Sequence, residues 1–232
     1  MSVTDHPINA RWPAENPGVL QLYSFPTPNG IKVSCMLEET GLAYEPHKVT
    51  LADEDVKSPE FLSLSPNNNI PAIIDPNGPE GRQVAIFESG AILIYLAEKT
   101  GMFLPTDPVE RIETIQWLMW QMGGVGPFFG QLGFFYAFAG KDIEDPRPAE
   151  RYINEAKRLL AVLETRLEGR EWIMGEYTIA DMAVAPWLRT LDVHYNAREV
   201  LGWADFPRVD AYLSRWLARP AAEKALNIPA RD

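Results

Sequence analysis

The order of apolar runs in this 232-residue sequence predicts an α/β N-terminal half followed by an all-helical C-terminal half. Between residues 20 and 100, patterns typical of strands and helices follow one another as βαβ, then α, then ββα. This order predicts a four-stranded mixed sheet with helices packed on it, the thioredoxin-like plan. After a linker at 103–108 that contains two prolines, apolar residues recur only at helical spacing. We therefore expect an N-terminal extension at 1–18 that lies on the surface or is partly disordered, a thioredoxin-like domain at 19–102 and an all-helical domain at 109–232.

The first strand and the first helix meet at the turn Thr27-Pro28-Asn29-Gly30. An apolar run at 19–25 predicts the strand, and an amphipathic run at 31–40 predicts the helix, which Gly41 should close as its C-cap. A helix start carries roughly half a positive charge and presents backbone N–H groups, so this turn favours an anion. A second strand is expected at 44–51.

Turn residues and short apolar runs define the rest of the α/β half. Pro59 opens a short helix that should end at Leu64, and a turn-rich loop follows it. The remaining expected elements are a strand at 70–75 with Pro71 at its entrance, a hairpin loop at 76–81, a strand at 83–87 and a helix at 88–99 that ends before Gly101.

The second half is expected to be helical throughout. Thr178 and Asp181 form a variant capping box, which we interpret as folding information rather than as a catalytic site. Six aromatic residues at 128–138 exceed what one helical face can hold, so some should pack in the core and others line an apolar pocket beside Thr27. The expected helices cover 109–122, which a glycine-rich stretch at 123–127 ends, then 148–167, 177–193 and 206–217.

Composition and charge exclude several classes of function. The net charge is −11 and no basic cluster is present, which excludes nucleic acid as a partner. No run of eighteen apolar residues predicts a membrane span. The single cysteine, Cys35, excludes an internal disulfide and suits the reducing cytosol; we interpret it as a buried, inert residue. Three histidines without metal-ligand spacing predict no metal site.

Candidate site residues first occur at the junction of the first strand and helix. Thr27 and Asn29 could each donate a hydrogen bond to a thiolate and, with the helix start, lower the pKa of a thiol. Such residues are more often simple helix caps, and that alternative stays open. The rival thiol activators are Tyr23 and Ser24, of which only one can face the site because strand side chains alternate between faces.

Two further junctions precede the third strand and the last helix of the α/β half. A cis Ile70–Pro71 bond would leave the Ile70 backbone able to pair with an extended peptide, whereas a trans bond would make Pro71 an ordinary edge-strand proline. Glu88 and Ser89 could hold an ammonium group and a carboxylate at the helix start. Alternatively, Ser89 only caps the helix.

Together these features resemble a cytosolic glutathione transferase over residues 20–220, most closely one of the bacterial nu class, which is known for disulfide-bond reductase activity. No single motif is specific, but the set is. The motifs are Tyr23 through Gly30, Ser65-Pro66-Asn67-Asn68 with Ile70-Pro71-Ala72-Ile73, Phe87 through Leu93, and Gln116-Trp117 through Gly126-Pro127.

The resemblance implies a role for each candidate residue in binding glutathione. The turn residues would hydrogen-bond the sulfur, the backbone before a cis proline would pair with the cysteinyl part, and the start of the last α/β helix would hold the γ-glutamyl end. An arginine of the helical domain would reach a glutathione carboxylate. The implied set is Thr27, Asn29, Ile70, Pro71, Glu88, Ser89 and Arg151.

Two positions depart from the pattern of the family. Val56 stands where a relative's loop supplies glutamine, and Asn69 stands where relatives often have lysine. Both changes remove contacts to the glycyl end of glutathione, so this end should be held differently or more weakly. Lys48 and Lys57 lie nearby in the sequence and are candidates to compensate.

The resemblance implies a glutathione-dependent disulfide-bond reductase with glutathione transferase activity, in which glutathione supplies the thiolate. Two glutathione molecules, or glutathione disulfide, in each subunit would favour reduction, and an open apolar pocket would favour conjugation. Two alternatives stay open: a transferase that conjugates apolar electrophiles, and a non-catalytic glutathione-binding regulatory module. The expected partners are small-molecule thiols, disulfides or electrophiles, and the expected protein is a cytoplasmic homodimer.

Overall fold

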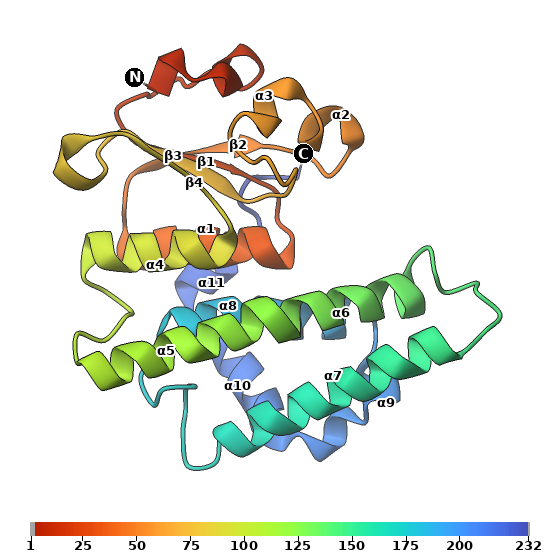
Figure 1. The fold of residues 1–232 in the computed structure, drawn as a ribbon. Helices are drawn as coiled ribbons and strands as arrows, with labels where there is room; N and C mark the ends of the chain where they lie inside the picture. Colours follow the sequence, from red (N-terminus) through yellow and green to blue (C-terminus); the bar gives the residue numbers. More distant parts are fainter. Residues whose placement is uncertain (1–2, 232) are drawn as a thin grey trace. The chain divides into compact units, whose positions relative to one another are not determined.

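The computed structural model describes residues 3–231, which divide into two compact units (Figure 1). The first unit comprises residues 3–102 together with 220–231. The second unit comprises Phe103–Arg219.

A four-stranded sheet in the order β2-β1-β3-β4 lies at the centre of the first unit. β1 pairs parallel with β2 and antiparallel with β3, and β3 pairs antiparallel with β4. This mixed sheet confirms the predicted thioredoxin-like plan. The strands are β1 (Leu20–Ser24), β2 (Tyr44–Lys48), β3 (Ala72–Asp75) and β4 (Val84–Phe87).

Two helices lie side by side on one face of the sheet (Figure 1). These are α1 (Pro28–Thr40) and α4 (Ser89–Thr100). Each ends before the predicted glycine, Gly41 (φ 67°) or Gly101 (φ 69°), whose left-handed conformation suits a residue without a Cβ atom. The other helices of the unit are α2 (Asp53–Val56), α3 (Pro59–Leu62), α11 (Pro220–Ala225) and a 3₁₀ turn at Pro79–Gly81.

The last residues of the chain pack on α1, which differs from the expected helical domain at 109–232. Two buried alanines of α11, Ala222 and Ala225, allow close packing between α11 and α1. Beyond α11, the Ser34 hydroxyl of α1 donates to the Ile228 carbonyl (3.1 Å). These contacts join residues almost two hundred positions apart, so the local periodicity of the sequence could not predict them.

The N-terminal extension covers the face of the sheet opposite α1 and α4 (Figure 1). Val3 and Ile8 are 1% and 0% exposed, and they join a core cluster that contains Tyr23 and Phe61. Of the two expectations for residues 1–18, partial disorder is therefore wrong for the described part, and residues 1 and 2 lie outside the described residues. The extension forms two 3₁₀ turns, Val3–Asp5 and Pro7–Ala10.

Replacing Ile8 by alanine should lower the free energy of unfolding by about 2–4 kcal/mol, because it removes a fully buried side chain from a packed cluster. Urea denaturation measures the change. Leu51→Ala is the matched control: Leu51 is 59% exposed in the same unit, so its loss should change stability by less than about 0.5 kcal/mol. Equal stability of the Ile8→Ala variant and the control would contradict a structural role for the extension.

The second unit is helical, as predicted. Its first helix does not end at the glycine-rich stretch: α5 continues into α6 through a π-helical turn at Gln121–Val125. Among the described residues, no helix is both long enough and apolar enough to span a bilayer. The helices are α5 (Pro108–Trp120), α6 (Gly126–Leu132), α7 (Arg147–Arg166), α8 (Ile179–Arg189), α9 (Arg198–Leu201) and α10 (Pro207–Leu217), with further π-helical turns at Gly133–Ala137 and Thr190–His194.

The predicted capping box is present at the start of α8. The Thr178 hydroxyl accepts from the Ala180 N–H (3.3 Å), and the Asp181 carboxylate accepts from the Thr178 N–H (2.8 Å). Asp181 also accepts from the Ile173 N–H (2.9 Å), and its side chain is fully buried. Asp181 is thus a structural residue that joins the start of α8 to the preceding loop.

Candidate functional site

The turn between β1 and α1 presents the start of the helix. Thr27 is the N-cap: its backbone is extended, and its Oγ1 accepts a hydrogen bond from the Gly30 N–H (3.3 Å). Pro28 and Asn29 are the first helical residues, and all three side chains are partly exposed. A threonine hydroxyl both accepts and donates. Capping α1 through its oxygen therefore leaves Thr27 able to donate its hydroxyl hydrogen to an anion at the helix start.

Gly30 allows α1 to begin close to β1. A Cβ atom at this position would lie 1.9 Å from the Phe25 carbonyl oxygen and 2.6 Å from the Ser24 Oγ. Because contacts this short do not occur, any other residue would move the helix start away from the strand. The glycine that ends the Thr-Pro-Asn-Gly turn thus fixes the position of Thr27 and Asn29 relative to the sheet.

Of the two rival thiol activators, Ser24 lies on the side of α1 and Tyr23 does not. The Tyr23 ring belongs to the cluster on the opposite face and stacks on His47, with ring centroids 4.6 Å apart. Its hydroxyl is buried without a hydrogen-bond partner among the described residues, and this burial raises the pKa of Tyr23. Tyr23 is therefore excluded as a hydrogen-bond donor at the start of α1.

The peptide bond between Ile70 and Pro71 is cis, as the resemblance implies. Ile70 precedes the paired part of β3, which begins at Ala72 opposite Tyr23 and Phe87. The loop before it is held by a hydrogen bond from the Ser65 hydroxyl to the Asn69 carbonyl (2.8 Å). Ile70 is thus placed just beyond the paired ends of β1 and β4.

The start of α4 lies on the same side of the sheet as α1. Glu88 occupies the N-cap position with a positive φ (73°, ψ 111°), a conformation that costs energy for any residue with a Cβ atom. Its side chain is exposed and does not cap the helix. Ser89 follows as the first helical residue and is 4% exposed. The possibility that Ser89 is the cap is therefore wrong: Glu88 takes that position.

Lys32, which no motif of the sequence singles out, contacts the start of α4. This lysine of α1 is 0% exposed, and its ammonium group donates to the Ser89 Oγ (3.2 Å). Burial lowers the pKa of Lys32 to about 7, and the negative charge of Glu88 opposes this shift. The only signal in the sequence is a lysine between two core residues, Ile31 and Val33.

Several predicted residues lie apart from these three junctions. Val56 is 8% exposed in the core cluster of the extension face, so it cannot replace a glutamine contact. Asn69 is exposed, and its amide donates to the Asn67 carbonyl (3.0 Å). Arg151 is exposed on α7 in the second unit, and its role stays a prediction, as does the aromatic pocket beside Thr27.

The two lysines proposed to compensate at the glycyl end have partners within the protein. Lys57 pairs with Asp53 (2.7 Å) on the surface of α2. The Lys48 ammonium donates to the Arg231 carbonyl (2.5 Å) near the end of the chain. Their compensating role stays a prediction that would require these contacts to be exchanged for a ligand.

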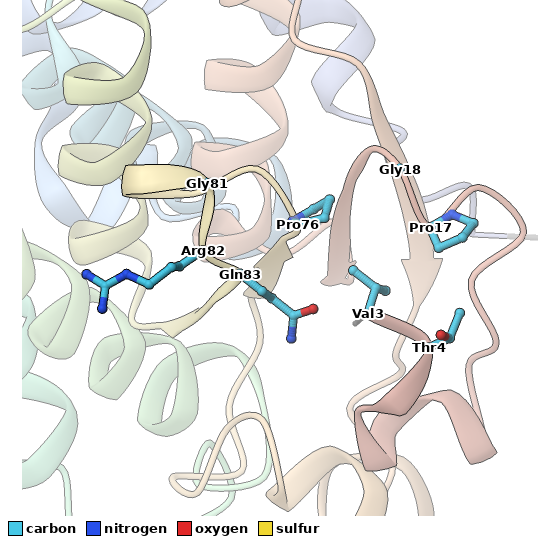
Figure 2. A pocket seen from close by; sticks show the side chains of 8 residues that line it. All are labelled: Val3, Thr4, Pro17, Gly18, Pro76, Gly81, Arg82 and Gln83. Atoms are coloured by element: carbon cyan, nitrogen blue, oxygen red, sulfur yellow. The ribbon is translucent and has the colours of Figure 1, made fainter. Parts of the chain in front are cut away.

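The first unit also contains a cavity of about 730 Å³, and Figure 2 shows the side chains that line it. None of the predicted site residues lines it, and Arg82, the one cation among the described residues that do, pairs with the neighbouring Glu80 (2.9 Å). Among the described residues, no group of three or more His, Cys, Asp or Glu side chains could hold a metal ion. The lining residues are Val3, Thr4, Pro17, Gly18, Pro76, Gly81, Arg82 and Gln83.

Both halves of the chain match known domain families. Residues 18–98 match the glutathione S-transferase N-terminal domain, and residues 132–220 match the glutathione S-transferase C-terminal domain. Disulfide-bond oxidoreductase YfcG of Escherichia coli (strain K12) is 45% identical over 210 residues, which span 90% of this chain and 94% of that protein.

Two crystal structures are similar over nearly the whole chain. A glutathione transferase from Pseudomonas putida, with one glutathione disulfide bound per subunit, has a TM-score of 0.98 and 57% identity and covers 99% of this chain and 100% of its own. A glutathione transferase from Burkholderia graminis, with two glutathione molecules bound per subunit, has a TM-score of 0.97 and 59% identity, with coverages of 100% and 98%.

Proposed function

Because the chain belongs to the glutathione S-transferase family, we propose that it is a glutathione-dependent disulfide-bond reductase of the nu class that also has glutathione transferase activity. The observation that carries the proposal is the start of α1. There the Thr27 hydroxyl can donate to an anion while its oxygen caps the helix, and Asn29 lies in the first turn. The helix start adds positive potential, so a thiolate is stabilised without a protein cysteine.

The proposed reaction is a pair of thiol–disulfide exchanges. The glutathione thiolate attacks one sulfur of a substrate disulfide, forms a mixed disulfide and releases the other sulfur as a thiolate. A second glutathione thiolate then attacks the glutathione sulfur of the mixed disulfide, which releases the second substrate thiol and leaves glutathione disulfide. Two solved structures hold ligands that fit these two steps. The Pseudomonas putida enzyme binds one glutathione disulfide per subunit, and the Burkholderia graminis enzyme binds two glutathione molecules per subunit.

The other candidate residues would hold the rest of glutathione. Ile70, beside the cis Pro71, would pair its backbone with the cysteinyl part. Glu88 would accept from the γ-glutamyl ammonium, and Ser89 at the start of α4 would receive the γ-glutamyl carboxylate. Arg151 would bind a further carboxylate through its guanidinium fork.

The proposal includes a homodimer in the cytoplasm that acts on small-molecule disulfides or electrophiles. The lone cysteine, Cys35, cannot form an internal disulfide, so the fold does not depend on an oxidising compartment. The reaction itself needs a pool of reduced glutathione. A native mass of two chains would support the dimer. The domain boundaries at 19–102 and 109–232 also stay proposals. The structure differs from them in one respect, because residues 220–231 pack with the first unit.

The test compares two reactions of one purified protein: glutathione-dependent reduction of bis(2-hydroxyethyl) disulfide and conjugation of 1-chloro-2,4-dinitrobenzene. We expect turnover in both, with the larger kcat/KM for the disulfide, and calorimetry should give two glutathione molecules or one glutathione disulfide per subunit. Turnover of the aryl halide alone would favour the transferase alternative. Glutathione binding without either reaction would favour the non-catalytic module.

Replacing Cys35 by alanine should leave the reductase kcat/KM within about twofold of that of the parent protein. Cys35 is 0% exposed in the middle of α1, so it can neither attack a substrate nor form a mixed disulfide without unfolding. The assay is the same disulfide reduction with glutathione. A loss of more than tenfold in a folded Cys35→Ala protein would contradict glutathione as the only nucleophile.

A further inference from the structure

Lys32 places a positive charge inside the first unit, where charged groups are costly. Its side chain is completely buried in the interface between α1 and α4. Lys32 occupies the second turn of α1, three residues after Asn29, so it joins the start of α1 to the start of α4. A buried lysine is retained against its desolvation cost when its charge meets a partner.

The partners of Lys32 lie at the proposed γ-glutamyl end of the site. Its Nζ is 3.2 Å from the Ser89 Oγ, and the negative charge of Glu88 favours its charged form. Two other lysines of the elements packed on α1 pair with carboxylates elsewhere. In α11, Lys224 pairs with Glu38 (3.4 Å), and in α4, Lys99 pairs with Asp75 (2.9 Å).

A carboxylate that binds at Ser89 approaches a protein that repels it. The net charge is −11, and Glu88 places a negative charge directly beside the start of α4. The helix start offsets part of this repulsion. A buried ammonium acts more strongly than a surface one, because little solvent screens it.

We propose that Lys32 is a positioning residue for the γ-glutamyl carboxylate of glutathione. Its ammonium group holds the Ser89 hydroxyl by a hydrogen bond and supplies a buried positive charge that attracts this carboxylate. The inference rests on the proposed function and adds to it a residue that does not touch the ligand. It predicts a coupling between ligand affinity and the charge of Lys32.

The coupling has a defined sign. Burial lowers the pKa of Lys32 to about 7, so the ammonium loses its proton as the pH rises through neutrality. A carboxylate bound at Ser89 favours the charged form, so binding takes up protons near pH 7. Affinity should therefore fall between pH 6 and pH 8, over a range in which the carboxylates of the ligand stay ionised.

The experiment measures binding of S-methylglutathione by calorimetry at pH 6 to 8, because this ligand has no thiol that titrates. Lys32→Met should raise the Kd about tenfold at pH 6.5 and remove its change between pH 6 and pH 7, where the α-amino group of the ligand stays largely protonated. Lys32→Arg should restore part of the affinity. Lys224→Met is the matched control, since it removes an exposed lysine beside the same helix and should leave the Kd unchanged.

A second ligand separates positioning from a merely structural role. In γ-aminobutyryl-cysteinylglycine, methylated at sulfur, the γ-glutamyl carboxylate is absent, so the parent protein and Lys32→Met should bind it equally. Lys32→Met should also melt at or above the parent temperature at pH 7, because methionine fills the site without a desolvation cost. Equal weakening for both ligands, or an unchanged Kd for S-methylglutathione, would overturn the inference.

The parent protein alone gives an independent check if Lys32→Met fails to fold. Calorimetry in two buffers with different ionisation enthalpies should show proton uptake on binding at pH 7, where the α-amino group of the ligand stays largely protonated, and none would overturn the inference. If the parent protein binds S-methylglutathione without that uptake, only the role of Lys32 fails. If the parent protein does not bind it at all, the proposed function fails as well.

Discussion

Replacing Thr27 and Asn29 together by alanine is expected to lower kcat/KM for glutathione-dependent disulfide reduction about a hundredfold. A single preorganised donor to a developing or resident anion is worth about 10²–10³ in rate where it has been removed from an enzyme. Here the anion is the glutathione thiolate. The Thr27 oxygen accepts from the Gly30 N–H, which leaves its hydroxyl hydrogen available to donate to the ligand.

The same variant should shift the pH–rate profile toward higher pH. Free thiols have a pKa near 8.5, and donors at a helix start lower that of the bound thiol. Without Thr27 and Asn29, the rise of kcat/KM with pH should shift toward the value of the free thiol, and raising the pH should recover part of the lost rate. The measurement is the reductase kcat/KM from pH 6 to pH 9.

Thr27→Ser is the matched control, since serine keeps the hydroxyl that caps α1 and donates to the ligand. It should retain at least about a third of the parent rate, an expectation that follows from the equivalence of the two hydroxyls. Loss of the cap alone costs about 1 kcal/mol of stability, so the double variant should stay folded at 25 °C. Full reductase activity of a folded double-alanine variant would contradict the assigned roles.

The sheet and its covering helices could be predicted because each leaves a local pattern. The runs around Thr27-Pro28-Asn29-Gly30 and the glycines at 41 and 101 mark strand ends, helix starts and helix ends within a few residues. The docking of α11 on α1 could not be predicted, because a short helix rich in alanine packs through contacts distant in the sequence. The glycine-rich stretch at 123–127 predicts the end of a helix, whereas in the structure α5 continues into α6 through the π-helical turn at Gln121–Val125.

The residues at the three junctions of the candidate site could be predicted from the sequence, whereas the buried lysine that contacts one of them could not. Thr27, Ile70 and Ser89 are marked by turn residues and by proline, which have strong local preferences. Lys32 lies in an amphipathic run, where a lysine normally marks the solvent face. In the structure, every residue from Gly30 to Leu37 is buried, because α1 packs on the sheet, beside α4 and against α11. The packing that buries Lys32 is tertiary and has no signature near position 32.

Replacing Asp181 by alanine is expected to lower the free energy of unfolding of the second unit by about 4 kcal/mol. The carboxylate accepts the Ile173 and Thr178 backbone N–H groups, at 2.9 Å and 2.8 Å, and is completely buried. Its removal leaves these two buried N–H donors without partners, each costing about 1–3 kcal/mol, and it opens a small cavity. The Thr178 hydroxyl, which also donates to this carboxylate (3.3 Å), loses its acceptor as well. Urea denaturation at pH 8 measures the change, since burial raises the pKa of Asp181 to about 6 and the group is then ionised.

Asp107→Ala separates the effect of burial from that of capping. Asp107 is the exposed N-cap of α5 and accepts the Val109 and Glu110 N–H groups, both at 3.0 Å. These donors reach water when the side chain is lost, so the cost should be only about 1 kcal/mol. Similar losses for the two variants would show that burial does not strengthen the α8 capping box.

Activity per folded molecule decides between the folding role of Asp181 and a catalytic one. The Asp181 carboxylate is completely buried, so a substrate cannot reach it to transfer a proton. The folded fraction of Asp181→Ala should therefore reduce disulfides with the parent kcat/KM at a temperature well below its melting point. A hundredfold lower kcat/KM in protein shown to be folded would instead make Asp181 part of the reaction and contradict its assignment to the capping box.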